Sequence, residues 1–203
     1  MLKLSYTKDM ADRLFFTSDQ HLLHKNIIKY SKRPFADIEE MHEVMVSRWN
    51  AKVPKDGVVI NLGDVSLGSA TETVALLKRL NGTQHMIVGN HDKTVLDSKP
   101  CREHFASIHH YGQLHIDDDD GNRGKQSIYM SHFPFEVWDR LYHGTWHLHG
   151  HCHNTLDSHD GQKRLDVGVD NPVCDFAPIS YNEVKYIMSG RVHYDYTQDR
   201  NQA

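Results

Sequence analysis

The sequence predicts an α/β fold whose strands bring polar side chains to one edge of a parallel sheet. Short apolar runs alternate with amphipathic segments in the order strand, helix, strand, helix, strand, and such an order implies parallel pairing through right-handed crossovers. Five polar patches each follow the end of a strand-like run, and ligands bind beyond the carboxyl ends of strands in open α/β sheets. A chain of 203 residues fits one domain, so we expect a single domain over residues 1–203.

The first half of the chain supplies three strands and two helices. Apolar runs at residues 14–17, 58–62 and 85–88 are typical of buried strands. Residues 37–49 open with a capping-box-like pattern and then place apolar side chains at helical spacing, which predicts an amphipathic helix. Residues 69–80 predict a second helix that ends just before a glycine.

The second half of the chain is expected to add more strands. Two of them are joined across an acidic loop with hairpin chemistry, whose run of aspartates at residues 117–120 we interpret as a solvated loop tip. Two further strands complete the core, and a terminal strand or hairpin follows them. The predicted ranges are residues 111–116, 125–131, 146–148, 164–167, 183–187 and 192–196.

The composition excludes several classes of protein. The formal net charge is −4 and no basic stripe is visible, so nucleic acid is not an expected partner. No apolar stretch approaches the ~18 residues that span a bilayer, and the polar start of the chain lacks the apolar region of a signal peptide. The three cysteines are odd in number and widely spaced, which favours reduced thiols and a cytoplasmic location. The 17 histidines are the compositional outlier.

Five polar patches at the predicted strand ends carry carboxylate, amide and imidazole side chains. They are Asp19-Gln20-His21, Gly63-Asp64, Gly89-Asn90-His91-Asp92, Ser131-His132 and Gly150-His151-Cys152-His153. Together they supply seven ligands, including a carboxylate able to bridge, which is enough for two metal ions side by side. Two ions roughly 3.5–4 Å apart are a standard device for hydrolysing phosphate esters. Oxygen and imidazole ligands without thiolates suit Mn, Fe, Zn, Ni or Mg, and we expect two divalent ions with Mn favoured.

The spacing within the patches supports this interpretation. Asp19 and His21 are two residues apart, as are His151 and His153, so each pair would share a face in a regular strand. A loop just past the strand can bring Asp19 and His21 to one ion. A glycine before Asp64 lets the backbone turn sharply. Any single patch is more often an ordinary loop or core feature than a metal site. If none of the five bound metal, finding all five in this order would require five independent coincidences.

The order Asp-x-His, Gly-Asp, Gly-Asn-His-Asp, His, Gly-His-x-His resembles the calcineurin-like metallophosphoesterase superfamily. These motifs span residues 19–153, about two-thirds of the chain, and every metal-ligand position is filled. The flanking sequences also resemble a small, compact subgroup of uncharacterised members that occurs in bacteria and phages. Those sequences are residues 18–28, 33–35 and 165–170.

The resemblance implies a four-layer α/β/β/α sandwich with the active site at the C-terminal ends of the central strands. It also implies which residues bind each metal ion. One ion would be held by Asp19, His21 and His153, and the other by Asn90, His132 and His151. Asp64 would bridge both ions together with a water or hydroxide. His91 would not bind metal, but would lie over the site and contact the substrate phosphate and the leaving group.

The same resemblance implies a hydrolytic mechanism. Two cations lower the pKa of the bridging water and neutralise the phosphate oxygens. His91 is expected to assist the leaving group as a catalytic residue, with Asp92 either orienting it or capping the following helix. His24 and Arg33 are candidate substrate contacts, Arg33 because an arginine can bind a phosphate with two parallel hydrogen bonds. Asp166 and Asp170 are expected to be structural, backing a metal-bound histidine.

Several functions fit this pattern, and we favour a phosphoesterase that prefers phosphodiesters over monoesters. Its partner would be a small phosphorylated substrate, while the oligomeric state stays open. One alternative is a catalytically inert scaffold of the same fold, although such members lose ligands or the histidine after the asparagine. Another is a small nuclease, although nucleases of the superfamily carry extra domains. A protein phosphatase is disfavoured because Asp-Arg-Gly does not follow the bridging Asp64. Monoesters, cyclic nucleotides and dinucleotide polyphosphates fit the same core, because specificity lies in loops.

Overall fold

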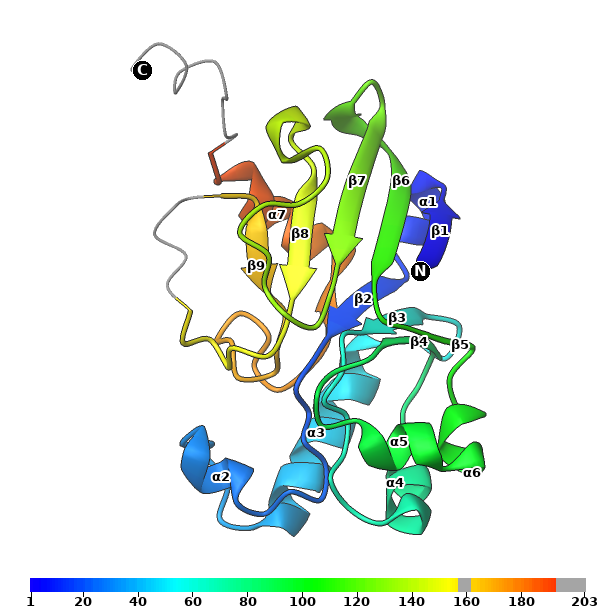
Figure 1. The fold of residues 1–203 in the computed structure, drawn as a ribbon, viewed down its shortest axis with the longest axis vertical. Helices are drawn as coiled ribbons and strands as arrows, with labels where there is room; N and C mark the ends of the chain where they lie inside the picture. Colours follow the sequence, from blue (N-terminus) through cyan, green and yellow to red (C-terminus); the bar gives the residue numbers. More distant parts are fainter. Residues whose placement is uncertain (157–161, 193–203) are drawn as a thin grey trace.

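The computed structural model describes residues 1–156 and 162–192, which form two sheets packed face to face (Figure 1). The first sheet has the strand order β10 (Ile179–Ser180), β2 (Leu14–Thr17), β3 (Val58–Asn61), β4 (Thr83–Ile87) and β5 (Ser107–His109). The second sheet has the order β1 (Leu2–Tyr6), β6 (Gly112–Asn122), β7 (Lys125–Met130), β8 (Trp146–His149) and β9 (Arg164–Asp166). The predicted two-sheet α/β sandwich is therefore confirmed.

The first sheet contains the predicted parallel strands. β2, β3, β4 and β5 pair in parallel, and β10 joins β2 in the antiparallel direction. The crossovers run through α3 (Ile38–Lys52) and α4 (Ala70–Leu77). Asp37 caps α3 by accepting a hydrogen bond from the backbone N–H of Glu40, and Ser69 caps α4 in the same way. Both helices therefore begin where the sequence predicts, because these caps satisfy N–H groups that lack a partner within the helix.

Helices cover the outer face of the first sheet. α3 packs Trp49 against Phe15 and Val59 of the sheet, and α4 lies beside α5 (Lys93–Asp97) and α6 (Lys99–Arg102) over β4. Two further short helices are α1 (Lys8–Ala11) and α2 (Ile27–Tyr30). None of the described helices is both long and apolar enough to cross a membrane.

The main core lies between the two sheets. Buried side chains from the first sheet, such as Phe16 and Ile60, meet Leu114 and Ile128 from the second. α7 (Tyr181–Ser189) contacts β2 and β10, lies behind β8 and β9 in Figure 1, and adds buried side chains to the same core. Because both sheets share this core, the strand ends of one are held in a fixed position relative to those of the other.

The outer face of the second sheet has a different cover. Trp138 and Leu141 pack on Tyr129 of β7, and they belong to a connecting segment that contains only the short 3-10 helix η1 (Leu141–His143). In the described part of the chain the fourth layer is thus this segment rather than a long helix.

Two local predictions are wrong. Residues 183–187 are part of the helix α7 and not of a strand, and most of 192–196 lies outside the described residues. The acidic run at 117–120 is not a solvated loop tip, because β6 continues through it. Asp118 is buried there and accepts hydrogen bonds from Tyr181 and Lys185 of α7.

Candidate metal centre

Loops from both sheets meet at one end of the sandwich. Asp19 and His21 follow β2, Asp64 follows β3 and Asn90 follows β4, all in the first sheet, whereas His132 follows β7 and the remaining two histidines follow β8, in the second. All seven side chains proposed as metal ligands come to this end: Asp19, His21, Asp64, Asn90, His132, His151 and His153. They therefore form one cluster between the sheets.

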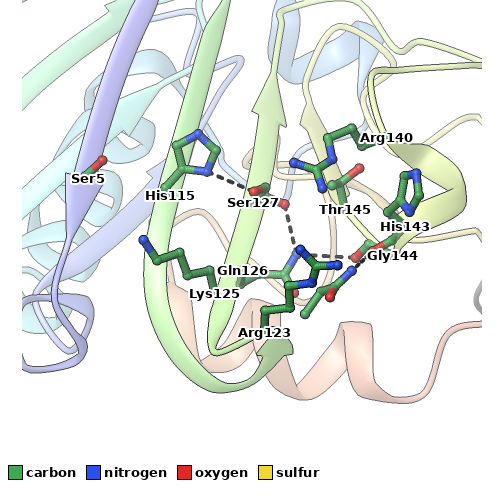
Figure 2. A pocket seen from close by; sticks show the side chains of 11 residues that line it. Ser5, His115, Arg123, Lys125, Gln126, Ser127, Arg140, His143, Gly144 and Thr145 are labelled. Atoms are coloured by element: carbon green, nitrogen blue, oxygen red, sulfur yellow. Dashed lines mark hydrogen bonds between the residues drawn. The ribbon is translucent and has the colours of Figure 1, made fainter.

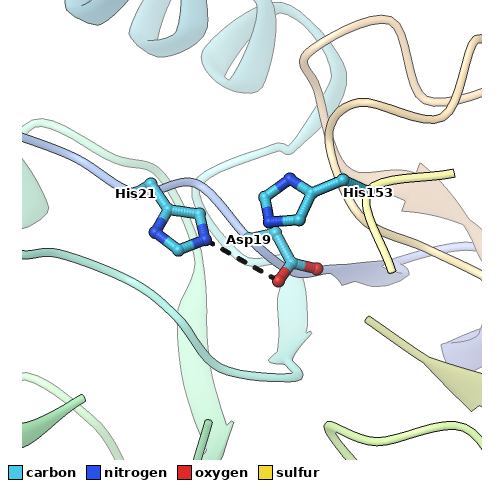
Figure 3. A group of neighbouring side chains, drawn as sticks. All are labelled: Asp19, His21 and His153. Atoms are coloured by element: carbon cyan, nitrogen blue, oxygen red, sulfur yellow. Dashed lines mark ion pairs between the residues drawn. The ribbon is translucent and has the colours of Figure 1, made fainter. Parts of the chain in front are cut away.

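The cluster contains two groups with the spacing of metal ligands. In the first, Asp19, His21 and His153 offer ligand atoms that all lie within 4.8 Å of one another (Figure 3). In the second, Asp64, His132 and His151 do the same. Each group is large enough to bind a metal ion through oxygen and imidazole nitrogen.

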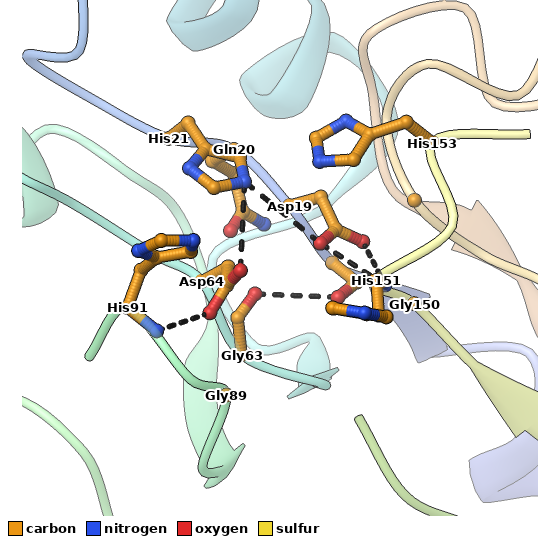
Figure 4. Close-up of polar contacts among 12 residues, drawn as sticks. Asp19, Gln20, His21, Gly63, Asp64, Gly89, His91, Gly150, His151 and His153 are labelled. Carbon is orange, nitrogen blue, oxygen red and sulfur yellow. Dashed lines mark hydrogen bonds and ion pairs between the residues drawn. The ribbon is translucent and has the colours of Figure 1, made fainter. Parts of the chain in front are cut away.

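Asp64 lies between the two groups. Its Oδ2 atom is 3.6 Å from His21 Nε2 of the first group and 3.4 Å from His132 Nε2 of the second. Asn90 joins the second group, because its Oδ1 atom is 3.0 Å from His132 Nε2 (Figure 4 shows the surrounding polar contacts). A carboxylate at this position is suited to bridge two ions.

The ligand loops adopt unusual backbone conformations. Five of the seven ligand candidates have a positive φ, with values of 59° at Asp19, 50° at His21, 55° at Asp64, 69° at His151 and 46° at His153. Residues other than glycine adopt this region rarely and at a cost, and they cluster at functional sites where the surroundings enforce them. The candidate ligands therefore lie in loops just past the strands and not on regular extended segments.

A close approach at Gly150 helps to hold Asp19. A Cβ atom at Gly150 would come within 2.4 Å of Asp19 Oδ2. The absence of a side chain lets the next N–H, that of His151, donate to both Asp19 oxygens at 3.1 and 2.9 Å. One ligand carboxylate is thus fixed by the backbone that carries another ligand.

Two ligand histidines have their outer nitrogen occupied. His132 Nδ1 donates to the carbonyl oxygen of Leu62 at 2.8 Å, and His153 Nδ1 donates to Asp170 Oδ2 at 2.6 Å. Such contacts fix the tautomer and leave Nε2 free for a metal. Asp170 therefore contacts a histidine that is a candidate metal ligand, whereas Asp166 accepts hydrogen bonds from the backbone of Asn154 and Gly168.

Arg33 does not face the substrate side, which contradicts its expected contact with a phosphate. Its guanidinium pairs with both oxygens of Asp170 at 2.8 Å and donates to the backbone carbonyls of Asp19 and Gln20. A remaining N–H faces the Met41 sulfur, and the residue is only 4% exposed. All of its donors are used within the protein, so Arg33 positions the Asp19 loop and, through Asp170, His153.

Asp92 also has a different role from the one expected. Its carboxylate accepts hydrogen bonds from the backbone N–H groups of Asp64, Val65 and Gly89, at 2.7–2.9 Å. The side chain caps no helix N–H, and no hydrogen bond joins it to the His91 ring in the described structure. Asp92 therefore ties the loop after β3 to the loop after β4, which is a positioning role.

A cavity of about 850 Å³ opens over both groups. Its lining includes the rings of His21, His91, His151 and His153, with His24 and Tyr30 at one side. His91 is exposed and its ring centroid lies 5.5 Å from that of His21. His24 lies 5.7 Å from His21, and its Nδ1 atom is buried without a hydrogen-bond partner. Two of the three residues expected to contact substrate without binding metal, His91 and His24, border this cavity, whereas Arg33 does not.

Burial dominates the electrostatics of the cluster. Asp19 is fully buried, and this burial raises its pKa to about 7. Burial also lowers the pKa of His21 to about 3, so its imidazole is neutral at physiological pH, as a metal ligand must be. Both ring nitrogens of His21 are buried without a partner among the described residues. Unpaired buried polar atoms are costly, so this donor set fits divalent cations.

The two packed sheets, together with the carboxylates and imidazoles at their strand ends, identify the chain as an α/β protein with a candidate metal-binding centre. The chain belongs to the calcineurin-like phosphoesterase family, whose family model matches residues 13–194.

Relatives of the chain come from archaea and phages. It is 33% identical over 186 residues to the uncharacterized protein MJ1445 of Methanocaldococcus jannaschii, covering 89% of this chain and 94% of that protein. It is 28% identical over 180 residues to the Gene 66 protein of Mycobacterium phage L5, covering 77% and 86%. The crystal structure of the protein of unknown function AQ665 from Aquifex aeolicus superposes with a TM-score of 0.64 and 23% identity, covering 86% of this chain and 98% of that one, and supports the fold.

Proposed function

We propose that the protein is a phosphoesterase that uses two divalent metal ions and prefers phosphodiesters to monoesters. The observation that carries this proposal is the pair of ligand groups that meet at Asp64 under a single open cavity. Asp19, His21 and His153 would hold one ion, Asn90, His132 and His151 the other, and Asp64 both.

When bound, two such cations supply a nucleophilic water near neutral pH and positive charge for the phosphate oxygens. The protein's own residues supply the remaining parts of the reaction. Asp19 and Asp64 are held in place by backbone N–H groups of His151 and His91, respectively. The His91 ring is free to donate a proton to the leaving oxygen, since its backbone rather than its side chain contacts Asp64. His24 borders the cavity and is the second side chain proposed to contact substrate.

The metals proposed are Mn above all, with Fe, Zn, Ni or Mg as alternatives. Carboxylate, amide and imidazole ligands suit these ions, and no cysteine belongs to either ligand group. We also propose a cytoplasmic location, because all three cysteines are unpaired thiols and reducing compartments keep thiols in this state.

The size of the cavity supports the preference for diesters. A volume of about 850 Å³ leaves room for an organic group on each side of a phosphate that contacts the metal ligands. Tyr30 at one side is 68% exposed and its ring lies 6.0 Å from that of His24, so one ester group could pack there.

The test is a panel of substrates on metal-stripped protein with each metal added back separately. We expect Mn to restore hydrolysis and bis-p-nitrophenyl phosphate to be hydrolysed with a higher kcat/KM than p-nitrophenyl phosphate. Faster hydrolysis of the monoester would reverse the assigned preference. No turnover of either ester or of natural nucleotides with any metal would favour the inert scaffold.

A further inference from the structure

A second cavity lies on the outer side of the second sheet. It has a volume of about 360 Å³ and opens between the tip of the β6–β7 hairpin and the turn at residues 140–145 (Figure 2). Its lining comes from both segments and from the strands beside them. The residues that matter to its chemistry are Arg123, Lys125, Arg140, His115, His143 and Ser127.

This cavity is separate from the metal centre. β7 begins at Lys125, beside the cavity, and ends at Met130, two residues before the ligand His132. A strand of this length spans roughly 20 Å at about 3.3 Å per residue. β8 runs parallel to β7, so its beginning at Trp146 also lies near the cavity, and the loop that follows it carries the ligand His151. The cavity and the metal centre are therefore at opposite ends of the same strands.

The residues that line the cavity are all positive or neutral. Arg123, Lys125 and Arg140 contribute three cations, and no Asp or Glu belongs to the lining. None of the three forms an ion pair in the described part of the chain, although Asp117 pairs with Lys125 in the hairpin register. The chain as a whole carries a formal charge of −4, so this concentration of positive charge is local. A cavity lined by one sign of charge attracts counter-ions.

Hydrogen bonds hold the two sides of the cavity together. Gln126 Nε2 donates to the carbonyls of Ser127 and Gly144, at 2.9 and 3.4 Å, and so links the hairpin to the turn. Arg123 and Arg140 both sit at left-handed positions, with φ values of 57° and 60°. Figure 2 shows both side chains near Ser127, with Arg140 higher and Arg123 lower in the view. The two arginines therefore lie in turns of defined backbone conformation at the rim of the cavity.

We propose that this cavity is a second, non-catalytic binding site for phosphoanions. The guanidinium groups of Arg123 and Arg140 would bind phosphate oxygens with paired hydrogen bonds, and Lys125 would add a point charge. A free diphosphate-like anion and the backbone of a single nucleic acid strand share this chemistry. The site does not depend on the proposed hydrolysis, because none of its residues belongs to the metal centre.

The experiment is an NMR titration of the full-length protein loaded with zinc, a diamagnetic ion. Methylenediphosphonate, which resists hydrolysis, is the small probe, and a 5′-phosphorylated oligothymidylate is the strand probe. We expect saturable shifts of backbone amides in residues 122–127 and 140–145. The double variant Arg123→Gln/Arg140→Gln should bind at least about tenfold more weakly, because two charge-assisted contacts are lost. The charge-matched control Lys55→Gln/Lys78→Gln, on the helical side, should bind like the wild type.

The two probes identify the source of the phosphate. Tighter binding of the oligonucleotide with a steep loss of affinity at higher salt assigns the site to a nucleic acid strand. Saturation by methylenediphosphonate alone assigns it to a small free anion. Hydrolysis of bis-p-nitrophenyl phosphate should be equal in wild type and both variants. Shifts confined to the metal-centre loops, no saturable shifts, or unchanged affinity of the double variant would overturn the proposal.

Discussion

His91 lies beside the ligand groups without being one of their members. Its backbone N–H donates to Asp64 Oδ1 at 2.8 Å, while its exposed ring borders the cavity. The backbone therefore helps to place the carboxylate proposed to bridge, and the side chain is left to act on substrate. Because the His91 ring belongs to neither ligand group, we expect a variant without the ring to keep its bound metal.

We expect His91→Ala to retain bound metal and lose activity. The loss should be about 10²- to 10⁴-fold in kcat if the imidazole protonates the leaving oxygen. It should shrink for esters whose leaving group has a low pKa, because those need little protonation. Metal analysis and kinetics on a series of aryl phosphate esters measure both effects, with the exposed His110→Ala as the control. Loss of metal would make His91 a ligand, and equal losses across the series would exclude the acid role.

Metal uptake should depend on pH through Asp19. Burial raises the pKa of this carboxyl to about 7, so the metal-free protein holds it largely protonated below that pH. Only the ionised form binds a cation, and binding must then release a proton. The affinity for Mn should therefore fall as the pH drops from about 7 to 5. Titration calorimetry in buffers of different ionisation enthalpy measures the released protons. An affinity independent of pH over this range would contradict the assignment of Asp19.

The chemical type of each ligand could be predicted from the sequence, whereas its local geometry could not. Side chains that bind metal are recognisable by type and order, which is why the seven candidates meet at one end of the fold. The positive φ values of Asp19 and His151 depend on contacts with distant segments. Arg33 and Asp92 were misassigned for the same reason, because only the tertiary structure brings their partners near: chiefly the Asp170 carboxylate for Arg33 and backbone N–H groups for Asp92.

At the scale of elements, the loops after β3 and β4 behave as one unit. Asp92, in the loop after β4, accepts three backbone hydrogen bonds, two of them from the loop that carries Asp64. The carboxylate is fully buried, so water cannot replace it. The position of Asp64 thus depends on a side chain that touches neither metal group.

Asp92→Ala should destabilise the fold and weaken metal binding together. A buried donor left without a partner costs about 1–3 kcal/mol, and this variant leaves three, so we expect a loss of about 3 kcal/mol or more in the free energy of unfolding. Urea denaturation measures this loss. The exposed neighbour Asp97→Ala should change stability by less than about 0.5 kcal/mol. A stable Asp92→Ala variant that binds metal normally would contradict this role.

Helices and strands with a clear apolar pattern were predicted correctly, whereas some shorter elements were missed or assigned the wrong type. The strands β2, β3 and β4 and the helices α3 and α4 were predicted because each has a clear apolar pattern, which ends at a polar residue after β2 and is bounded by a cap or glycine in the other four. α7 was taken for a strand, although Ser180 and Glu183 form a capping box that marks a helix start. β1 was missed, although Leu2, Leu4 and Tyr6 alternate with polar residues as in a strand with one buried face.

At the scale of the whole molecule, the metal centre joins the two sheets. Asp19 and Asp64 come from loops of the first sheet, and His132 and His153 from loops of the second. Bound cations would therefore add to the hydrogen bonds that already join these loops, such as those from His151 N–H to Asp19 and from His132 Nδ1 to the Leu62 carbonyl. The two-sheet arrangement was predicted from the family resemblance. Nothing in the sequence indicated that an irregular segment covers the outer face of the second sheet.

Metal should raise the thermal stability of the entire fold. A ligand that binds only the folded state at 100 times its Kd adds about 2.7 kcal/mol. For a chain of this size, that corresponds to an increase in Tm of about 5–10 °C, at about 2–4 °C per kcal/mol. Scanning calorimetry of stripped and Mn-loaded protein measures the increase. An unchanged Tm at saturating Mn would contradict a centre that spans both sheets.

The central claim is that two ions act together at a centre bridged by Asp64. The most direct test is the hydrolysis of bis-p-nitrophenyl phosphate by metal-stripped protein as Mn is added in known equivalents. Activity should rise until two equivalents per chain are bound and then level off, while Asp64→Asn should stay near background throughout because both ions lose a shared ligand. Full activity at one equivalent, or near-wild-type activity of Asp64→Asn, would contradict the account.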